Sequence, residues 1–409
     1  MNDVAQRVIR EVKNIIYISV IAISLYSCSN NEDKTAHDNK EKNAIIKYKP
    51  AFEGQTKIAT VITNPPYKLD SLTCKLGRPW AIIPFPGNRF LVTDRTGFMQ
   101  LLSSEGVILK KITGFPEVWI KGQGGLLDVA LDPEFNSNKT IYWTFSQPFG
   151  KGNCTAVAKG QLSETNSVIH NPKVIFQALP DLNSDLHFGS RLLFDKEGYI
   201  FISAGERSIL EGRKQAQLLN SGLGKIFRIT KEGKPAPGNP FINQKDAMPE
   251  IYSYGHRNPE GLDINPITGD LWESELGPMG GDEVNIIKPG KNYGWPIITY
   301  GLEYNGDKVG EGIQQKNGLE QPVYYWDPVL SPSGMTFYNS DSIPQWKNNL
   351  FICGLSSMHV ARLIVENNKV VGEESLLIDK KERCRDITQF NGALYIVTDG
   401  GLLFRISKK

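Results

Sequence analysis

One short phrase returns six times along this chain of 409 residues. Each copy contains a tight turn with Gly or Asn, a strand of alternating apolar residues, and then small or charged residues. The copies start at Pro86, Ser137, Lys196, Thr268, Lys347 and Asn391. A strand-rich unit that recurs at intervals of roughly 40–80 residues is typical of a radial array, most often a β-propeller. We therefore predict an all-β fold, a six-bladed β-propeller of four-stranded antiparallel blades, over residues 52–409.

A ring of blades needs a strand that closes it. The segment Lys57–Ile62 is predicted to join the blade formed by the last copy, so that no long strand edge stays unpaired. Polar residues at the strand ends of several blades are predicted to meet at one mouth of a central channel. Any chemistry is therefore expected at that mouth.

The charge balance excludes one class of partner. The 46 basic and 44 acidic residues give a net charge of +2, and they are interspersed without a long basic run. This pattern argues against electrostatic binding of nucleic acid.

The N-terminus is predicted to be a targeting signal and not part of the fold. Basic residues up to Lys13 precede the apolar run IIYISVIAISLY, which is too short to span a bilayer comfortably. The ending Leu25–Cys28 resembles a bacterial lipobox, in which Cys28 would be lipidated. Residues 1–28 are thus predicted to be a lipoprotein signal and 29–51 a charged tether, with an ordinary signal peptide as the alternative. The expected location is the periplasm or the outer-membrane or cell surface of a bacterium, with the lipid as membrane anchor.

Four cysteines follow Cys28, and they lie far apart without metal-ligand spacing. In an exported protein they can be buried thiols or form at most one disulfide, whose connectivity the sequence does not give. They are Cys74, Cys154, Cys353 and Cys384.

A histidine and a carboxylate flank one predicted hairpin. His187 precedes its first strand and Glu206 ends the second, so the two side chains can face each other. A carboxylate on one imidazole nitrogen fixes the tautomer and raises the basicity of the other nitrogen, as a general base requires. The alternative is a histidine that only makes a structural hydrogen bond.

Two further clusters contain arginine. Arg257 and Asn258 lie in a turn bounded by Gly and Pro, and they suit recognition of carboxylates and carbonyls. Arg383 and Arg385 alternate on a strand, so they should project from one face without nearby matched acids, as in an anion site. The alternatives are a surface arginine beside a turn-forming asparagine, and ion pairs with a neighbouring blade.

An acidic turn runs from Glu275 to Asn285. Its Gly and Pro residues leave backbone carbonyls unpaired, and Asp282 and Glu283 add carboxylates. Mixed carbonyl and carboxylate oxygens suit Ca²⁺ better than Zn²⁺. A solvated acidic turn is the alternative.

From about Leu76 onward the chain resembles a known family. The ordered motifs are GQGGLLDVALDPEF, HFGSR, GKIFRI, GHRNPEGL, GPMGGDEVNII, KNYGWP and RCRD. Together they are similar to the soluble pyrroloquinoline-quinone-dependent sugar dehydrogenases, the glucose/sorbosone and aldose sugar dehydrogenase family of six-bladed propellers. The resemblance implies oxidation of an aldose at its anomeric hydroxyl, with hydride passing to the quinone and then to an external electron acceptor.

The resemblance also implies roles for particular residues. His187 matches the base and Glu206 the acid that orients it. Ca²⁺ is implied at the cofactor through the carbonyls of Gly277 and Pro278, and at a further site through Glu283 and Tyr293. The positions that match quinone-binding residues are Gln123, Arg257, Asn258, Arg383, Arg385 and Asp399.

Three departures from the family pattern reduce the contacts around the cofactor. Leu186 replaces an aspartate, Leu276 replaces a polar residue, and Ser356 stands where a lysine helps to hold the quinone. The changes at Leu186 and Ser356 favour a second hypothesis, a propeller without redox activity that binds a glycan or a protein. A calcium-dependent hydrolase such as a lactonase is the third.

Overall fold

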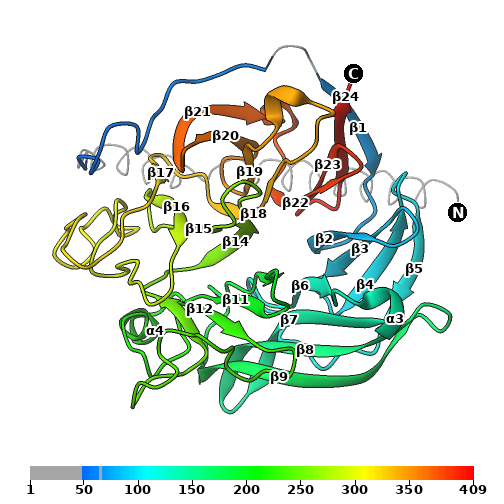
Figure 1. Ribbon diagram of the computed structural model, residues 1–409, viewed down its shortest axis with the longest axis horizontal. Coiled ribbons are helices and arrows are strands. Elements are labelled where there is room, and N and C mark those ends of the chain that lie inside the picture. The colour runs from blue at the N-terminus through cyan, green and yellow to red at the C-terminus, as the bar shows by residue number, and fades with distance from the viewer. Residues whose placement is uncertain (1–47, 64–66) are drawn as a thin grey trace, which may run out of the picture. The chain divides into compact units, whose positions relative to one another are not determined.

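The structure is a computed structural model that describes residues 48–63 and 67–409. The predicted signal, Cys28 and most of the predicted tether lie outside these residues. In the described part, β-strands form six four-stranded antiparallel sheets. The sheets follow one another around a central axis, as Figure 1 shows, so the predicted six-bladed propeller is confirmed. No described helix is long and apolar enough to cross a membrane.

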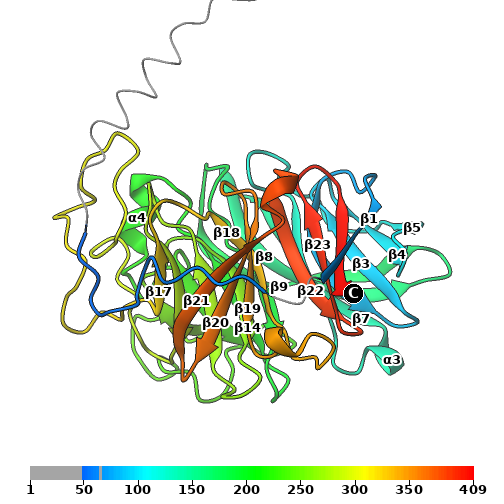
Figure 2. The ribbon, with the colours of Figure 1, turned by 90° about the horizontal axis from the view of Figure 1, so that it is seen from above.

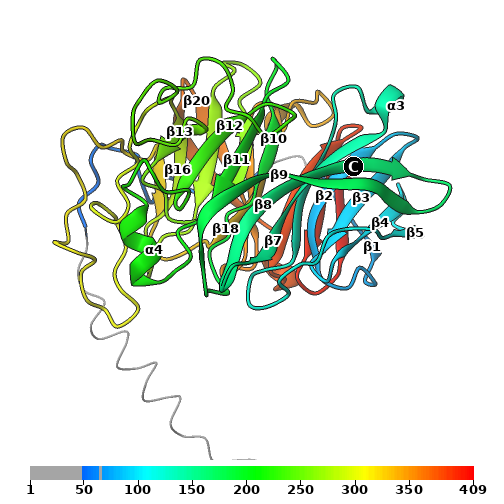
Figure 3. The same ribbon diagram turned by 90° about the horizontal axis from the view of Figure 1, so that it is seen from below.

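Blades one to three follow the chain order. Blade one contains β2 (Pro79–Phe85), β3 (Arg89–Asp94), β4 (Phe98–Ser103) and β5 (Ile108–Ile112). Blade two contains β6 (Leu126–Leu131), β7 (Thr140–Phe149), β8 (Gly152–Ser163) and β9 (Val168–Leu182). Blade three contains β10 (Leu192–Phe194), β11 (Ile200–Ala204), β12 (Lys225–Ile229) and β13 (Ile251–Tyr254). The short helices α3 (Phe135–Asn138) and α4 (Leu210–Gln215) lie on opposite faces of the ring (Figures 2 and 3).

Blades four to six complete the ring. Blade four contains β14 (Pro259–Ile264), β15 (Leu271–Glu275), β16 (Asp282–Ile287) and β17 (Tyr324–Trp326). Blade five contains β18 (Pro332–Phe337), β19 (Leu350–Gly354), β20 (Val360–Glu366) and β21 (Lys369–Leu376). Blade six contains β22 (Cys384–Phe390), β23 (Ala393–Thr398), β24 (Leu403–Lys408) and β1 (Tyr67–Thr73). Two 3₁₀ turns, η1 (Pro344–Trp346) and η2 (Ile378–Lys380), lie in the connections of the last two blades.

The recurring phrase of the sequence is the second strand of every blade. The six copies contain β3, β7, β11, β15, β19 and β23. In the first three blades a hydroxyl of this strand joins the next blade: Thr93 donates to the Leu127 carbonyl at 2.6 Å and Thr144 donates to the Ser190 carbonyl at 2.6 Å. Ser203 donates in the same way to the Pro259 carbonyl. The small polar residue of these three copies therefore fixes one blade to the next.

The closing strand is not the segment predicted from the sequence. β1 (Tyr67–Thr73) pairs antiparallel with β24, so the ring closes through residues that follow Lys57–Ile62. The earlier segment runs along blade five instead, where Thr60 forms a parallel bridge with Glu373 of β21 (Figure 2). The prediction of the closing segment was therefore wrong, although closure by an N-terminal strand was right.

Apolar side chains fill the spaces between successive blades. Trp80 and Leu91 of blade one, for example, pack in one cluster with Leu126 and Trp143 of blade two. Burial of such faces is the main favourable term in folding. Along the axis, the innermost strands of all six blades line a hollow of about 380 Å³.

The four described cysteines are free thiols. Cys154, Cys353 and Cys384 are buried, as predicted, whereas Cys74 is exposed. No disulfide joins them.

Candidate active site at the channel mouth

The innermost strands all begin at one end of the channel, so the residues that precede them gather there. Gln123 precedes β6, His187 precedes β10, and Arg257 and Asn258 directly precede β14. Arg383 precedes β22. The predicted mouth therefore contains residues from blades two, three, four and six.

His187 and Glu206 form the pair that the sequence predicts. His187 Nδ1 and Glu206 Oε1 lie 2.6 Å apart, and the two side chains are 5% and 1% exposed. The same carboxylate oxygen accepts the Ser208 N–H at 3.1 Å. Gln123 Oε1 accepts the backbone N–H of His187 at 2.7 Å, and His187 has a left-handed φ of 50°. The imidazole is therefore fixed both at its ring and at its backbone.

The surroundings keep the imidazole of His187 neutral. Burial lowers its pKa most, the positive charge of Arg257 lowers it further, and Glu206 raises it, with a net value of about 4. Nδ1 faces a carboxylate, so it carries the proton, and the lone pair is on Nε2. Within residues 48–63 and 67–409, Nε2 has no hydrogen-bond partner. The neutral ring can therefore accept a proton from a molecule at the mouth.

Glu260 connects four blades at the centre of the mouth. Its carboxylate accepts Asn258 Nδ2 at 3.0 Å and Arg385 Nη1 at 3.0 Å, and Ser333 Oγ lies at 3.2 Å. Its backbone carbonyl accepts Arg191 Nε at 2.9 Å. Glu260 lies in the motif GHRNPEGL, whose sequence alone does not predict a role for it. Only the ring brings its partners from blades three, five and six to it.

Arg383 and Arg385 converge, but they do not lack acidic partners. Arg385 Nε and Nη2 bond both oxygens of Asp399, at 2.8 and 3.2 Å, while Arg383 Nε bonds Asp399 Oδ2 at 3.0 Å. Arg385 also pairs with Glu260. The expectation of two arginines without matched acids was therefore wrong, because Asp399 and Glu260 reach them from other strands.

A further arginine was missed at this mouth. Arg95 follows β3 and donates from Nε to the Gly124 carbonyl at 3.2 Å, and from Nη2 to the Gly122 carbonyl. Burial lowers its pKa most, and the charges of Arg385 and Arg78 add to this, with a net value of about 10. Its place at the end of the recurring phrase, as for Glu206, is the signal that could have found it.

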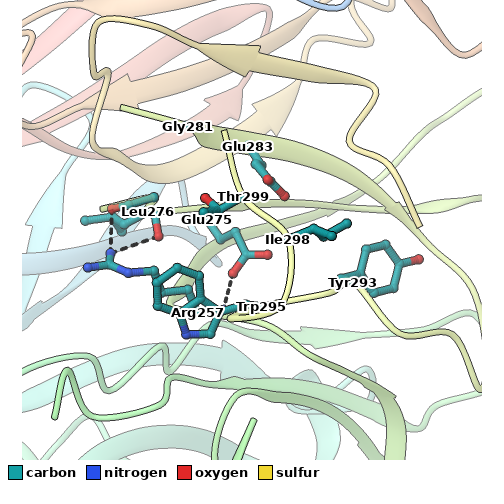
Figure 4. A pocket seen from close by; sticks show the side chains of 10 residues that line it. Arg257, Glu275, Leu276, Gly281, Glu283, Tyr293, Trp295, Ile298 and Thr299 are labelled. Atoms are coloured by element: carbon teal, nitrogen blue, oxygen red, sulfur yellow. Dashed lines mark hydrogen bonds between the residues drawn. The ribbon is translucent and has the colours of Figure 1, made fainter. Parts of the chain in front are cut away.

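Arg257 contacts one of the two carbonyls that were predicted to bind calcium, that of Gly277. Its Nη1 donates to the carbonyl of Leu276 at 3.0 Å and to that of Gly277 at 2.5 Å, and its backbone N–H bonds Glu275 (Figure 4). Asp282 accepts the Gly277 N–H at 2.8 Å and shapes this turn. Pro278 offers a carbonyl that accepts no hydrogen bond within the described part of the chain.

Carboxylates cluster behind this turn in blade four. Glu275 and Glu283 lie opposite each other on β15 and β16, and Figure 4 shows both beside one cavity. The cavity has about 10 Å³, room for about one water molecule or ion. Burial, followed by the charge of Glu275, raises the pKa of Glu273 and that of Glu283 well above the usual range.

Tyr293 also borders the cavity, but its hydroxyl is engaged elsewhere. The hydroxyl donates to the Ile286 carbonyl at 2.6 Å and accepts the Lys288 N–H at 2.9 Å. Only the backbone carbonyl of Tyr293 remains as an oxygen ligand.

The three departures from the family pattern lie around the mouth. Leu186 is 41% exposed beside the imidazole. Leu276 is half-buried, and its carbonyl accepts Arg257. Ser356 is exposed and bonds Ser331 Oγ at 2.8 Å.

Comparison with known proteins decides the family. Residues 76–405 match the model described as Glucose / Sorbosone dehydrogenase. The chain belongs to this family. This match confirms the resemblance to the soluble quinone-dependent sugar dehydrogenases that the motifs indicated.

Three relatives illustrate the membership. Aldose sugar dehydrogenase YliI of Escherichia coli (strain K12) is 41% identical over 347 residues, which are 83% of this chain and 93% of that protein. The crystal structure of the apo-form of the soluble aldose sugar dehydrogenase from Escherichia coli matches with a TM-score of 0.80 at 39% identity, over 84% of this chain and 100% of that one. The PQQ-bound aldose sugar dehydrogenase of Streptomyces coelicolor matches with a TM-score of 0.69 at 25% identity, over 85% and 99%.

Proposed function

We propose that this family member is a sugar dehydrogenase that uses pyrroloquinoline quinone and Ca²⁺ to oxidise the anomeric hydroxyl of an aldose to the lactone. The observation that carries the proposal is the buried His187–Glu206 pair, with an imidazole Nε2 free at a mouth that arginines surround. Electrons would leave to an external acceptor.

The residues at the mouth fit the quinone. Its three carboxylates need cationic and amide donors, and guanidinium groups bind carboxylates in pairs of parallel hydrogen bonds. Arg257, Arg383 and Arg385 supply these donors, with Asn258 and Gln123 beside them, and Asp399 holds two of the arginines in place. When bound, the quinone supplies the two-electron acceptor for the hydride.

The oxygen donors of blade four fit Ca²⁺. The carbonyls of Gly277 and Pro278 would hold it at the cofactor, where it acts as a Lewis acid. Because Arg257 donates to the Gly277 carbonyl at 2.5 Å, calcium bound there would require Arg257 to release that carbonyl. At the further site, Glu283 and the Tyr293 carbonyl border the small cavity.

His187 removes the proton in this reaction. Its Nε2 accepts the proton of the anomeric hydroxyl, the C1–H bond breaks with transfer of hydride, and a C=O bond forms at C1. Glu206 stabilises the imidazolium that results, and its bond to Nδ1 keeps Nε2 directed at the substrate. Gln123 and the Ser208 N–H hold this pair in position.

A second candidate function is a propeller that binds a glycan or a protein without redox activity. The observation in its favour is that Asp399 and Glu260 already neutralise Arg385, while Ser356 gives no positive charge. The exposed Leu186 beside the base points the same way.

Titration separates the two candidates. The purified protein is titrated with the quinone and Ca²⁺, and aldoses are then added while the absorbance of the quinone is followed. The dehydrogenase predicts saturable binding and reduction by sugar. Binding without reduction by any aldose contradicts it and supports the second candidate, as does the absence of binding.

We also propose that the protein is an exported lipoprotein anchored through Cys28. One acyl chain holds a protein on a membrane only marginally, whereas several hold it firmly. A Cys28→Ala variant is expected to move from the membrane fraction to the soluble envelope fraction. An unchanged distribution contradicts the anchor.

A further inference from the structure

Three buried side chains of blade four point to one another. His256, Glu273 and Glu275 each place a ligand atom within 4.8 Å of the other two. Their exposed fractions are 0%, 0% and 4%. Glu273 and Glu275 alternate on β15 and so share a face of the sheet, while His256 lies in the turn before β14. Glu283 is not a member of this group.

The carboxylates of this group have no cationic side chain to balance them. Among the described residues, neither Glu273 nor Glu275 forms an ion pair with Lys or Arg, and His256 is the one basic neighbour in contact. Asn285 Nδ2 donates to Glu273 Oε2 at 3.1 Å, but Glu273 Oε1 is buried without a partner. A buried carboxylate oxygen of this kind requires a proton or a cation.

The imidazole is oriented as a metal ligand would be. Its Nε2 bonds Ser253 Oγ at 2.8 Å, and the ring stacks on Tyr293 with centroids 4.7 Å apart. Metal-bound histidines usually have such a partner on the second nitrogen. This arrangement leaves Nδ1 facing Glu275 Oε1 at 3.4 Å.

That separation fits two ligands of one ion better than a hydrogen bond. Good N–H···O bonds are about 2.7–3.2 Å long. Two ligands about 2.0–2.1 Å from a tetrahedral ion lie about 3.3 Å apart. Nitrogen together with carboxylate oxygen suits Zn²⁺, whereas Ca²⁺ prefers oxygen alone.

We propose that His256 Nδ1, Glu273 Oε1 and Glu275 Oε1 bind a divalent transition-metal ion of the Zn²⁺ type. The three ligand atoms differ from those of the calcium sites proposed at Gly277 and Pro278 and at Glu283, although Glu275 also borders the cavity beside Glu283. Glu275 Oε2 accepts the backbone N–H of Arg257, so the ion would stiffen the turn that carries Arg257 and Asn258. Because the group is buried, the ion enters as the chain folds.

The test is metal uptake during refolding, which needs no sugar activity. The full chain is unfolded with chelator and refolded with or without one equivalent of Zn²⁺, and bound metal is measured after gel filtration. The parent is expected to retain about one Zn²⁺ per chain and to melt at a higher temperature with it. Refolding with Co²⁺ gives a second readout, the visible absorption of a tetrahedral ion, which depends on no variant.

Variants then assign the ligands. Glu273→Gln is expected to lower Zn²⁺ affinity at least tenfold, while Glu374→Gln, a control that removes a buried carboxylate in blade five, retains it. A parent without stoichiometric Zn²⁺ overturns the proposal, as does a Glu273→Gln variant that binds Zn²⁺ as the parent does. If Glu273 is instead a neutral acid, Glu273→Gln keeps the parent's melting temperature and neither protein responds to Zn²⁺. The Zn²⁺ measurements do not depend on dehydrogenase activity. Failure of the metal proposal can therefore be distinguished from failure of the proposed function.

Discussion

Replacement of Glu206 by glutamine tests the proposed base through two effects. The rate at neutral pH should fall, and the acidic limb of the pH profile should move to lower pH. The amide keeps an oxygen for His187 Nδ1 and for the Ser208 N–H, so the geometry persists while the charge is lost. Burial lowers the pKa of His187 most and Arg257 lowers it further, whereas Glu206 raises it, with a net value of about 4. Glu206→Gln therefore makes the imidazole a weaker base.

The size of the effect on rate follows from the charge that develops on the imidazole. Two unit charges about 4 Å apart interact by about 4 kcal/mol at an effective dielectric constant of 20. With the proton about half transferred in the transition state, about 2 kcal/mol of this is lost, or about 30-fold in kcat/KM. The fall should be smaller than for His187→Ala, since a general base is worth about 10²–10⁴-fold.

The second effect is a shift in the pH dependence of kcat/KM. In the parent, His187 is protonated below its pKa, so kcat/KM should fall as the pH drops through about 4. In Glu206→Gln this fall should move to lower pH while the plateau drops. The assay is dye-coupled turnover of the protein reconstituted with quinone and Ca²⁺, with Glu374→Gln, which removes a buried carboxylate paired with Arg362 in blade five, as the matched control.

Two results would refute this reasoning. An unchanged plateau in Glu206→Gln would show that the carboxylate does not assist the base. A fall in activity that moves to higher pH would show that the titrating group is not His187.

The remaining predictions concern binding and stability. His187→Ala should lose turnover and still bind the quinone, as equilibrium titration would show, because the arginines remain; loss of both would assign His187 to cofactor binding. Excess Ca²⁺ at about one hundred times its dissociation constant should stabilise the protein by about 2.7 kcal/mol over chelator, and equal melting temperatures would contradict a calcium site. Asp399→Asn should lower the free energy of unfolding by about 2 kcal/mol at pH 7. Burial alone would raise the pKa of Asp399, but Arg385 and Arg383 lower it overall, so this stability is present above about pH 4 and is lost as pH falls through the folded pKa. The difference in stability between Asp399→Asn and the parent should therefore shrink as the pH falls below about 4, and a constant difference would contradict the ion pair.

The sequence predicted those features that depend on residues close along the chain. The recurring phrase gave the number of blades, because each copy is one complete second strand. His187 and Glu206 could be paired because they flank one hairpin. Its antiparallel register places the residue before β10 close to the residue after β11. Local patterns of this kind survive folding because tertiary contacts reinforce them.

Other features depended on contacts between distant parts of the chain. Glu260 reaches Arg385 from blade four, so the acidic partners of Arg385 could not be recognised near it in sequence. Likewise, Lys57–Ile62 and Tyr67–Thr73 are both short extended segments. Which of them pairs with β24 is decided by where the ring leaves an open edge, because strand preference is set by neighbours as much as by residue type.

The pairing of β1 with β24 makes the ring depend on the order in which the chain is synthesised. β1 is made before any other strand of the propeller, and its partner is made last. Until β24 has been synthesised, blade six cannot be completed, and the flanks of blades one and five lack a complete neighbour. Pairing of β1 with β24 costs loop-closure entropy, and no contact formed earlier offsets this cost. The ring should therefore close late and slowly. The newly made chain thus needs protection from aggregation until β24 has been synthesised. Removal of β24 would leave β1 without its pairing partner.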